Sequence, residues 1–341
     1  MLISILIPCR NEGAEIGRFV AELFGQCLRP DWELELLVAD GRSDDGTREM
    51  LDELSAKEPR LQVIDNPRRT TPAALNLAIL RARGEVLVRM DVHTTYAQDY
   101  VLRSVETLLE TGADCVGGPW MPRGDGPVSS AIALSFSSPW VSGGGRSHDP
   151  TYEGPVDTVY LGCWRSDAFH RFGLFDETLT RAQDSEMNLR IWRKGGSVWQ
   201  SPSIRSWYTP RDSFDQLFRQ YAQYGYWKIA TLKKHRVPAS VRQLAPGAFL
   251  AVLLLLGTSA PFSVTATWAL GSLVWAYLLG SAFFTMQLWR RSGDGRIAVR
   301  LPLVFACFHF GFGYGYLRGI LDFFLLSRTA GSKRLETLTR V

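Results

Sequence analysis

A tract of 47 residues without a charged side chain constrains this chain more than any other feature of its sequence. Residues 243–289 contain no Asp, Glu, Lys or Arg. A membrane-spanning helix needs about 20 apolar residues, so the tract is too long for one span and suits two. Residues 257–261 supply a turn between them. We therefore expect spans near 244–260 and 264–289.

The charged residues divide the rest of the chain into two unlike parts. The whole chain has 38 Lys and Arg against 34 Asp and Glu. Residues 290–341 hold nine of the basic and three of the acidic residues, whereas residues 1–242 hold 29 and 31. A mildly acidic first part lacks the basic stripe of a protein that binds nucleic acid polymers. The basic C-terminal part, with its tail at 328–341, favours a membrane surface as partner.

A third apolar segment, at about 301–326, is ambiguous. It contains Arg318 and Asp322, which can pair with each other at membrane depth, and glycines at 311, 313 and 315 that indicate close helix packing. If the part of the chain before these segments lies in the cytoplasm, a third full span would place the basic tail on the outer side of the membrane. That placement would violate the positive-inside rule. Two alternatives stay open, a full span and a re-entrant or interfacial segment, within a membrane region that we expect to cover 243–327.

The segment at 212–236 predicts an amphipathic helix. Phe214, Leu217, Phe218, Tyr221 and Tyr224 share one helical face, and the basic residues lie elsewhere. Aromatic side chains opposite a basic face are typical of a helix lying in a membrane interface. The alternative is a helix packed on the protein core, and the neighbouring charge-free tract favours the interface.

Residues 1–211 predict an α/β domain. Short apolar runs at 2–7, 34–39, 61–64 and 85–90 alternate with helical periodicity, which indicates a mostly parallel, Rossmann-like sheet covered on both faces. Ligands bind such sheets at the carboxyl ends of the strands. Residues 119–156 are rich in Pro and Gly and predict a long binding loop with one short helix at 132–136.

Carboxylates follow two of the predicted strands. Asp40 ends the second, and Asp91 with His93 ends the fourth, where an Asp and an imidazole can hold Mg²⁺ or Mn²⁺ beside phosphate oxygens. Asp184 begins a predicted helix, where it can serve as a general base. Each pattern also has an ordinary structural explanation, since turns and first helical turns favour acidic residues.

Several segments together resemble a known family. SILIPCRNE, LLVADGRSDDGT, EVLVRMDVH, FDETLTRAQDSEMNLRIWRKGG and QYAQYGYWK, in this order and spacing, resemble the motifs of family 2 glycosyltransferases, which have a GT-A fold. The Asp-x-His, the Gly-Gly-Gly-Arg loop and VDTVYLGCWRSD are similar to the ExoA-like branch, named for succinoglycan biosynthesis. The resemblance covers about residues 1–230.

The resemblance implies a role for each matching residue. The nucleotide-binding residues would be Pro8, Arg10, Glu12, Asp40 and Asp91. Asp40 would bind the uracil of a UDP-sugar, and Asp91 would bind the sugar diphosphate and Mn²⁺ or Mg²⁺, with His93 as second metal ligand in place of the usual Asp.

The resemblance also places the catalytic base at Asp184, although Gln183 stands where the family has Glu. Arg146, Gln220 and Trp227 would contact the acceptor or the diphosphate. The Gln-x-x-Arg-Trp element of processive synthases is only partly matched, which argues against a polymerising enzyme.

The expected function is inverting transfer of a sugar, which we expect to be glucose, from UDP to a polyprenyl-diphosphate-linked sugar. This reaction would serve exopolysaccharide or cell-surface glycan assembly at the inner (plasma) membrane, with a cytoplasmic catalytic domain. Two alternatives remain open. One is transfer to a bare polyprenyl phosphate, as in dolichyl-phosphate-mannose synthases, and the other is a non-catalytic membrane scaffold.

Overall fold

A computed structural model describes residues 1–237 and 241–327, so the predicted basic tail at 328–341 lies outside the described residues. The chain divides into two compact units. Unit 1 comprises Met1–Met121 and Asp149–Tyr208, and unit 2 comprises Pro122–His148 and the chain from Thr209 onward. The sequence placed residues 1–211 in one domain, whereas the structure groups 122–148 with the C-terminal helices.

Unit 1 is built on an eight-stranded sheet of order β3-β2-β1-β4-β9-β6-β10-β8. Its strands are β1 (Leu2–Cys9), β2 (Glu33–Asp40), β3 (Leu61–Asp65), β4 (Val86–Arg89), β6 (Cys115–Gly118), β8 (Gly154–Pro155), β9 (Tyr160–Arg165) and β10 (Val198–Gln200). The first four strands pair in parallel, whereas β9 runs antiparallel to both β4 and β6. The four predicted strands are confirmed as β1 to β4.

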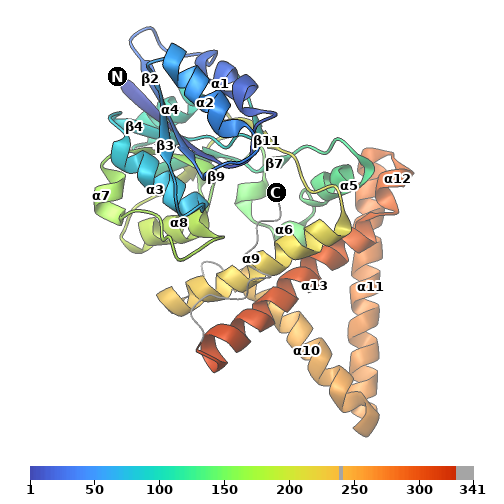
Figure 1. Cartoon of the computed structure of the whole chain (residues 1–341). Coiled ribbons are helices and arrows are strands. Elements are labelled where there is room, and N and C mark those ends of the chain that lie inside the picture. Colours follow the sequence, from blue (N-terminus) through green and yellow to red (C-terminus); the bar gives the residue numbers. More distant parts are fainter. Residues whose placement is uncertain (238–240, 328–341) are drawn as a thin grey trace. The chain divides into compact units, whose positions relative to one another are not determined.

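Helices cover both faces of this sheet, as Figure 1 shows. One face packs against α1 (Ile16–Phe24), α2 (Thr47–Lys57) and α4 (Tyr100–Thr111), and the other against α3 (Thr71–Arg81), α7 (Ala168–Phe172) and α8 (Gln183–Arg193). The central strands are buried on both sides, which is why they read as continuous apolar runs in the sequence. A small second sheet pairs β5 (Thr94–Tyr96) with β11 (Ser206–Tyr208), and β7 (Met121–Pro122) lies at the boundary of the unit.

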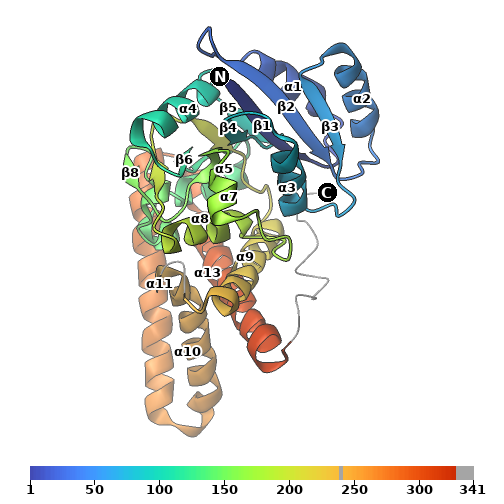
Figure 2. The same ribbon diagram turned by 90° about the vertical axis from the view of Figure 1, so that its left-hand side faces the viewer.

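Unit 2 is helical. Its helices are α5 (Pro127–Ser135), α6 (Pro139–Ser142), α9 (Phe214–His235), α10 (Ala245–Ser259), α11 (Val264–Ser292), α12 (Gly295–Ala298) and α13 (Leu301–Gly319), and α13 continues as a π-helix over Ile320–Leu325. Short 3₁₀ turns occur at Arg146–His148, Val241–Leu244 and Ala260–Phe262. The turn at Ala260–Phe262 joins α10 to α11 (Figure 2).

Three helical stretches of unit 2 are long and apolar enough to cross a membrane: Arg242–Phe262, Val264–Ser292 and Gly295–Leu325. The first two match the predicted spans. In their most apolar windows only 6% of residues are buried by protein, against 44% in the third. The third segment therefore differs from the others in being partly enclosed by the protein itself.

Helices α9 and α13 lie side by side in both views (Figures 1 and 2), and glycines set how closely they approach. A Cβ atom at Gly315 would lie 1.8 Å from the carbonyl oxygen of Ala222, and one at Gly225 would lie 2.1 Å from that of Phe312. Apolar side chains of α13 pack against the aromatic face of α9, which includes Phe218 and Tyr221. The predicted close helix packing is confirmed, because small residues allow backbones to touch.

That contact changes the interpretation of α9. The face predicted to lie in a membrane interface packs on α13 and α5, with Leu217 fully buried and Phe214, Phe218 and Tyr221 packed against the same cluster. An aromatic face suits a helix partner as well as a lipid surface, and the helix partner occupies it. The predicted pairing of Arg318 with Asp322 is confirmed at 3.2 Å, and the Tyr226 hydroxyl donates to the same carboxylate.

The segment predicted as a loop with one short helix is more regular than expected. It contains α5 and α6, and both begin with a proline, Pro127 and Pro139. Proline breaks a helix interior but suits the first helical turn, where its missing N–H would have no partner in any case. Pro127 and Pro139 therefore begin helices and do not interrupt them.

Candidate active site

The register of the sheet brings the predicted nucleotide-binding residues to one edge of unit 1. Pro8 is opposite Ala39 in the parallel pair β1–β2, and Cys9 is opposite Asp40. Arg10 follows β1 directly, and its side chain packs within 3.3 Å of where a Cβ at Gly41 would stand. The structure therefore places Pro8, Arg10 and Asp40 on adjacent strand ends, as the sequence predicted.

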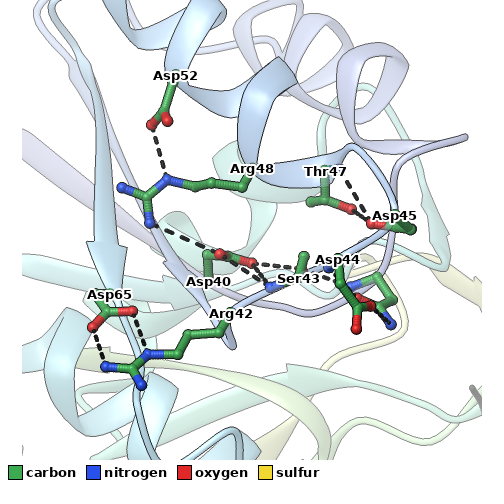
Figure 3. Close-up of polar contacts among 10 residues, drawn as sticks. Asp40, Arg42, Ser43, Asp44, Asp45, Thr47, Arg48, Asp52 and Asp65 are labelled. Atoms are coloured by element: carbon green, nitrogen blue, oxygen red, sulfur yellow. Dashed lines mark hydrogen bonds and ion pairs between the residues drawn. The ribbon is translucent and has the colours of Figure 1, made fainter.

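Asp40 is buried and already holds the loop that follows it (Figure 3). Its carboxylate accepts a hydrogen bond from the Ser43 hydroxyl at 2.6 Å and lies 3.9 Å from the Arg48 guanidinium. Its side chain is 1% exposed. Nearby, the Thr47 hydroxyl accepts from the backbone N–H of Glu12 at 2.8 Å, which ties the loop after β1 to the start of α2.

The ends of β1 and β4 also meet. Nδ1 of His93 lies 3.3 Å from a carboxylate oxygen of Glu12, so two residues predicted for different roles are in contact. The backbone of Asp91 is fixed by Tyr96, whose hydroxyl accepts from the Asp91 N–H at 2.6 Å and donates to the Asp91 carbonyl at 3.1 Å. Burial raises the pKa of Tyr96 well above its ordinary value, so this hydroxyl keeps its proton.

Arg89 joins the two most important predicted carboxylates. Its Nε and Nη2 donate to the two oxygens of Asp91 at 2.8 and 2.9 Å, and its Nη1 donates to Asp184. Burial lowers the pKa of the guanidinium, but Asp184 and Asp91 raise it by more, so Arg89 remains a cation. Asp91 and Asp184, 93 positions apart in the sequence, are therefore neighbours.

Helix α8 presents Asp184 in its first turn. Ala182, the residue just before the first residue of α8, has a left-handed backbone with φ of 63°, which turns the chain sharply into the helix. Arg190, further along α8, donates to the carbonyls of Phe172 and Leu174 at 2.6 and 2.7 Å and fastens the helix to the segment after α7. The orientation of Asp184 thus depends on the backbone of α8, which Arg190 holds in place.

An aromatic cluster borders this edge. The Tyr160 hydroxyl shares a 2.9 Å hydrogen bond with Thr94, and the ring stacks on Trp120 at 5.4 Å between centroids. Tyr208 meets Trp120 edge to face. Burial raises the pKa of Tyr160, so its hydroxyl keeps its proton. Flat, uncharged surfaces of this kind suit the apolar faces of a sugar ring.

The residues at this edge suit a divalent cation only together with a substrate. Among the described residues, no three His, Cys, Asp or Glu side chains are grouped as a metal site. Mg²⁺ commonly binds one or two carboxylates and takes its other ligands from phosphate oxygens and water. Both Asp91 oxygens accept from Arg89, yet each carboxylate oxygen has a second lone pair. Asp91, with His93 nearby, therefore fits a metal that arrives with a diphosphate.

Three predicted contact residues belong to unit 2. Arg146 is exposed and begins the 3₁₀ turn at Arg146–His148. Gln220 is buried on α9, where its Nε2 donates to the Tyr224 hydroxyl at 3.1 Å. Trp227 is 1% exposed and meets Tyr226 edge to face. The buried positions of Gln220 and Trp227 give both residues a packing role within unit 2.

Arg89 is the residue that the sequence interpretation missed. It stands in an apolar strand, Val86–Arg89, whose other three residues are all buried. A lone cation in a strand that is covered on both faces requires a buried partner. That requirement indicates that a buried acidic partner exists, but only the structure identifies the partners as Asp91 and Asp184.

Comparison with known proteins identifies the family of this chain. The model of Glycosyl transferase family 2 matches residues 4–170. Succinoglycan biosynthesis protein ExoA of Rhizobium meliloti is 32% identical over 331 residues, which cover 94% of this chain and 95% of that protein. A dolichyl N-acetyl-alpha-D-glucosaminyl phosphate 3-beta-D-2,3-diacetamido-2,3-dideoxy-beta-D-glucuronosyltransferase of Methanococcus voltae is 26% identical over 328 residues, covering 94% and 97%.

Among solved structures, the mannosyltransferase PcManGT of Pyrobaculum calidifontis, determined in complex with GDP-Man and Mn²⁺, superposes with a TM-score of 0.63. It is 18% identical, and the match covers 94% of this chain and 87% of that one. The class of the protein is thus a glycosyltransferase with the Rossmann-like GT-A fold and C-terminal apolar helices. The chain belongs to glycosyltransferase family 2, in its ExoA-like branch.

Proposed function

We propose that this chain is a membrane-bound inverting glycosyltransferase that moves glucose from UDP-glucose to a polyprenyl-diphosphate-linked sugar. The observation that carries the proposal is the pairing of Asp91 and Asp184 through Arg89 at the carboxyl ends of the strands. One carboxylate suits the donor diphosphate and the other suits the acceptor hydroxyl. The proposed site lies in the cytoplasm at the inner (plasma) membrane, and its product serves exopolysaccharide or cell-surface glycan assembly.

In this mechanism Asp184 removes the proton from the acceptor hydroxyl as that oxygen attacks the anomeric carbon from the face opposite the departing UDP. Its side chain is 33% exposed, so a substrate can reach it. General-base assistance of this kind contributes about 10²–10⁴-fold in rate. Anchoring of α8 by Arg190 keeps the carboxylate in place during the attack.

The donor side depends on Asp91, His93 and the strand ends. Pro8, Arg10, Glu12 and Asp40 bind the nucleotide, and Asp91 and His93 would hold Mn²⁺ or Mg²⁺ against the diphosphate. When bound, such a cation stabilises the negative charge of the leaving UDP, which is worth several kcal/mol. For Asp40 to contact uracil, it must share or exchange its hydrogen bond with Ser43. Arg146, whose side chain is exposed, completes the proposal as a contact to the acceptor or the diphosphate. Gln220 and Trp227, predicted for the same role, are buried and act in the proposal through the packing of unit 2.

The lipid-linked acceptor is supported by two features. Arg242–Phe262 and Val264–Ser292 are long, apolar and almost uncovered by protein, as is expected of helices in lipid. The Methanococcus voltae relative is named for a dolichyl-phosphate-linked sugar as its acceptor. A sugar hydroxyl as nucleophile also gives Asp184 a proton to remove, whereas a phosphate needs no base.

The test uses membranes containing the full chain, a panel of radiolabelled nucleotide sugars and an extraction of lipid-linked product, with and without Mn²⁺. We expect label from UDP-glucose in the lipid fraction. Asp91→Ala and Asp184→Asn should each abolish transfer, and only Asp91→Ala should weaken UDP binding in the presence of Mn²⁺. Glu110→Gln, an exposed change on α4, is the matched control and should keep full activity.

Three outcomes would change the proposal. Transfer from GDP-mannose alone would replace the donor. Full activity of Asp184→Asn with bare polyprenyl phosphate as acceptor would favour a polyprenyl-phosphate glycosyltransferase. Absence of both transfer and donor hydrolysis would leave a non-catalytic membrane scaffold.

A further inference from the structure

We propose that Arg89 is a positioning residue that sets the distance between the donor-side carboxylate and the catalytic base. This inference rests on the proposed function and concerns a residue that touches neither substrate in the mechanism above. It acts through Asp91 and Asp184, which its guanidinium holds at the same time. Its role is to keep the Asp184 carboxylate at a fixed distance and direction from the Asp91 carboxylate.

Arg89 stands in a buried environment. It ends β4, where its register partner on β1 is Leu6 and where Val88 pairs with Cys163 of β9. Its side chain is only 5% exposed. A cation at such a position is costly unless charged partners compensate it. The described partners of Arg89 are the carboxylates of Asp91 and Asp184 in the candidate site. These two negative charges compensate the buried cation.

The hydrogen bonds of Arg89 are directional. Nε and Nη2 form the two-pronged contact with Asp91, at 2.8 and 2.9 Å, and Nη1 points to Asp184. A guanidinium is planar and rigid, so binding Asp91 with one edge fixes the direction in which Nη1 points. Asp184 then has a defined place relative to Asp91, although α8 and β4 are far apart in sequence. A lysine ammonium would keep the charge and lose this direction.

Asp91 and Asp184 are held in place by different contacts. The Asp91 backbone is held by Tyr96, so its side chain is the fixed reference. Asp184 follows the left-handed residue Ala182 in a first helical turn, and Arg89 is the described contact that links it to the donor side. Without the fork, Asp184 remains in α8 but is no longer aligned to Asp91. A misplacement of about 1 Å between reacting groups costs about 10²-fold in rate.

The experiment compares Arg89→Lys with the parent chain as full-length protein in detergent, with rates normalised to UDP-binding sites. We expect kcat for transfer to fall about 10²-fold, while the KM for the donor stays within about threefold because donor binding is not the lost interaction. A merely structural role would reduce the number of binding sites and leave kcat per site unchanged.

Arg83→Lys is the matched control. Arg83 also pairs with a buried carboxylate, that of Glu35, with Nε and Nη2 each 2.8 Å from the same oxygen. Its side chain is more exposed than that of Arg89, and it precedes β4, at the opposite end of that strand. It should leave kcat unchanged. An equal loss of kcat in both variants would overturn the assignment, since the effect would then follow from disturbing any paired arginine of the sheet.

A second variant covers the case in which Arg89→Lys does not fold. Asp184→Glu keeps both charges and moves the base by one methylene group, so it should lower kcat with little change in donor KM. Full activity of Arg89→Lys, or of Asp184→Glu, would overturn the positioning role and leave the proposed function standing. A parent chain that transfers no sugar to lipid would overturn the proposed function, and the positioning role with it.

Discussion

In unit 1, hydrogen bonds between charged groups fix the positions of side chains at the carboxyl ends of the strands. In unit 2, glycines, which have no side chain, set the distance between α9 and α13. Arg89 holds two carboxylates through directed hydrogen bonds. Gly225 and Gly315 let two helix backbones touch because neither residue has a side chain at the contact. Both contacts demand accuracy, but they fail differently. A charged contact fails when a partner is lost, and a glycine contact fails when an atom is added.

The difference follows from the surroundings of each contact. In unit 1 the strand ends carry the carboxylates of Asp91 and Asp184, and a buried cation compensates both of them. In unit 2 the helices are long and apolar, and hydrophobic burial gives little reason for one apolar helix to prefer another in lipid. Close packing of backbones supplies that preference instead.

The largest effect should come from removing the charged contact. Arg89→Met leaves Asp91 and Asp184 without their shared cation, and breaking such a buried pair should lower the free energy of unfolding by about 3 kcal/mol. Thermal unfolding of the full chain in detergent measures it. Arg103→Met, which breaks only half-exposed pairs with Asp99 and Glu106, should cost less than about 1 kcal/mol. Equal shifts would show that burial is not what matters.

The glycine contact should break with a single added methyl group. In Gly315→Ala the new Cβ would stand 1.8 Å from the Ala222 carbonyl oxygen, so the helices must separate at a cost of about 1–3 kcal/mol. Gly271→Ala in α11 meets nothing within 4 Å and should gain up to about 1 kcal/mol from helix propensity. The two thermal midpoints should therefore move in opposite directions, and a neutral Gly315→Ala would contradict the close approach.

A third test concerns pH and the polar contacts of the sheet. Burial raises the pKa of Glu35, but hydrogen bonds from Ser4 and Arg83 lower it by more, so it lies below the ordinary value of 4.5. The unfolded chain then binds this proton at a higher pH than the folded chain does. The stabilisation is complete above about pH 5 and is lost as the pH falls through the folded-state pKa.

Glu35→Gln cannot take part in this titration. Its thermal midpoint should fall less steeply than that of the parent between pH 5 and the acid limit, while at pH 7 it should lose about 1 kcal/mol from weaker hydrogen bonds. Unit 2 variants such as Gly271→Ala should keep the parental slope. A parental slope in Glu35→Gln would assign the acid sensitivity to other carboxylates.

The smallest effect is expected at an exposed ion pair at the carboxyl ends of β2 and β3. Arg42 forms a two-pronged contact with Asp65 at 3.2 and 3.1 Å (Figure 3), with both side chains about half exposed. Exposed pairs of this kind contribute little to stability. Arg42→Gln should leave the thermal midpoint within experimental scatter. A clear loss would mean that directed geometry matters even without burial.

Much of unit 1 could be predicted from the sequence because its rules are local. Apolar runs became β1 to β4, and the residues after them formed one edge because parallel strands end together. Arg89 was missed because a single charged residue in a strand gives no indication of where its partner lies. Asp184 is 95 residues away, and only the fold brings the two together.

Unit 2 was harder to predict because one pattern serves two environments. The aromatic face of α9 would suit lipid or another helix, and periodicity alone does not distinguish them. The glycines of α13 pointed to close packing, but they did not identify α9 as the partner. Pro127 and Pro139 suggested a loop because proline interrupts the interior of a helix. Here both residues stand in the first turn of a helix, a position that proline suits.

The interrupted make-up of unit 2 has a consequence for how the chain is synthesised. Trp140, in α6, receives a 2.8 Å contact from His309 of α13, 169 residues later. At 5–20 residues per second the ribosome needs roughly 8–34 s to supply that partner. Throughout this interval Ala131, Ile132 and Phe136 lack the α13 residues that bury them in the finished protein. The stretch 122–148 is thus where a nascent chain of this protein would need a chaperone.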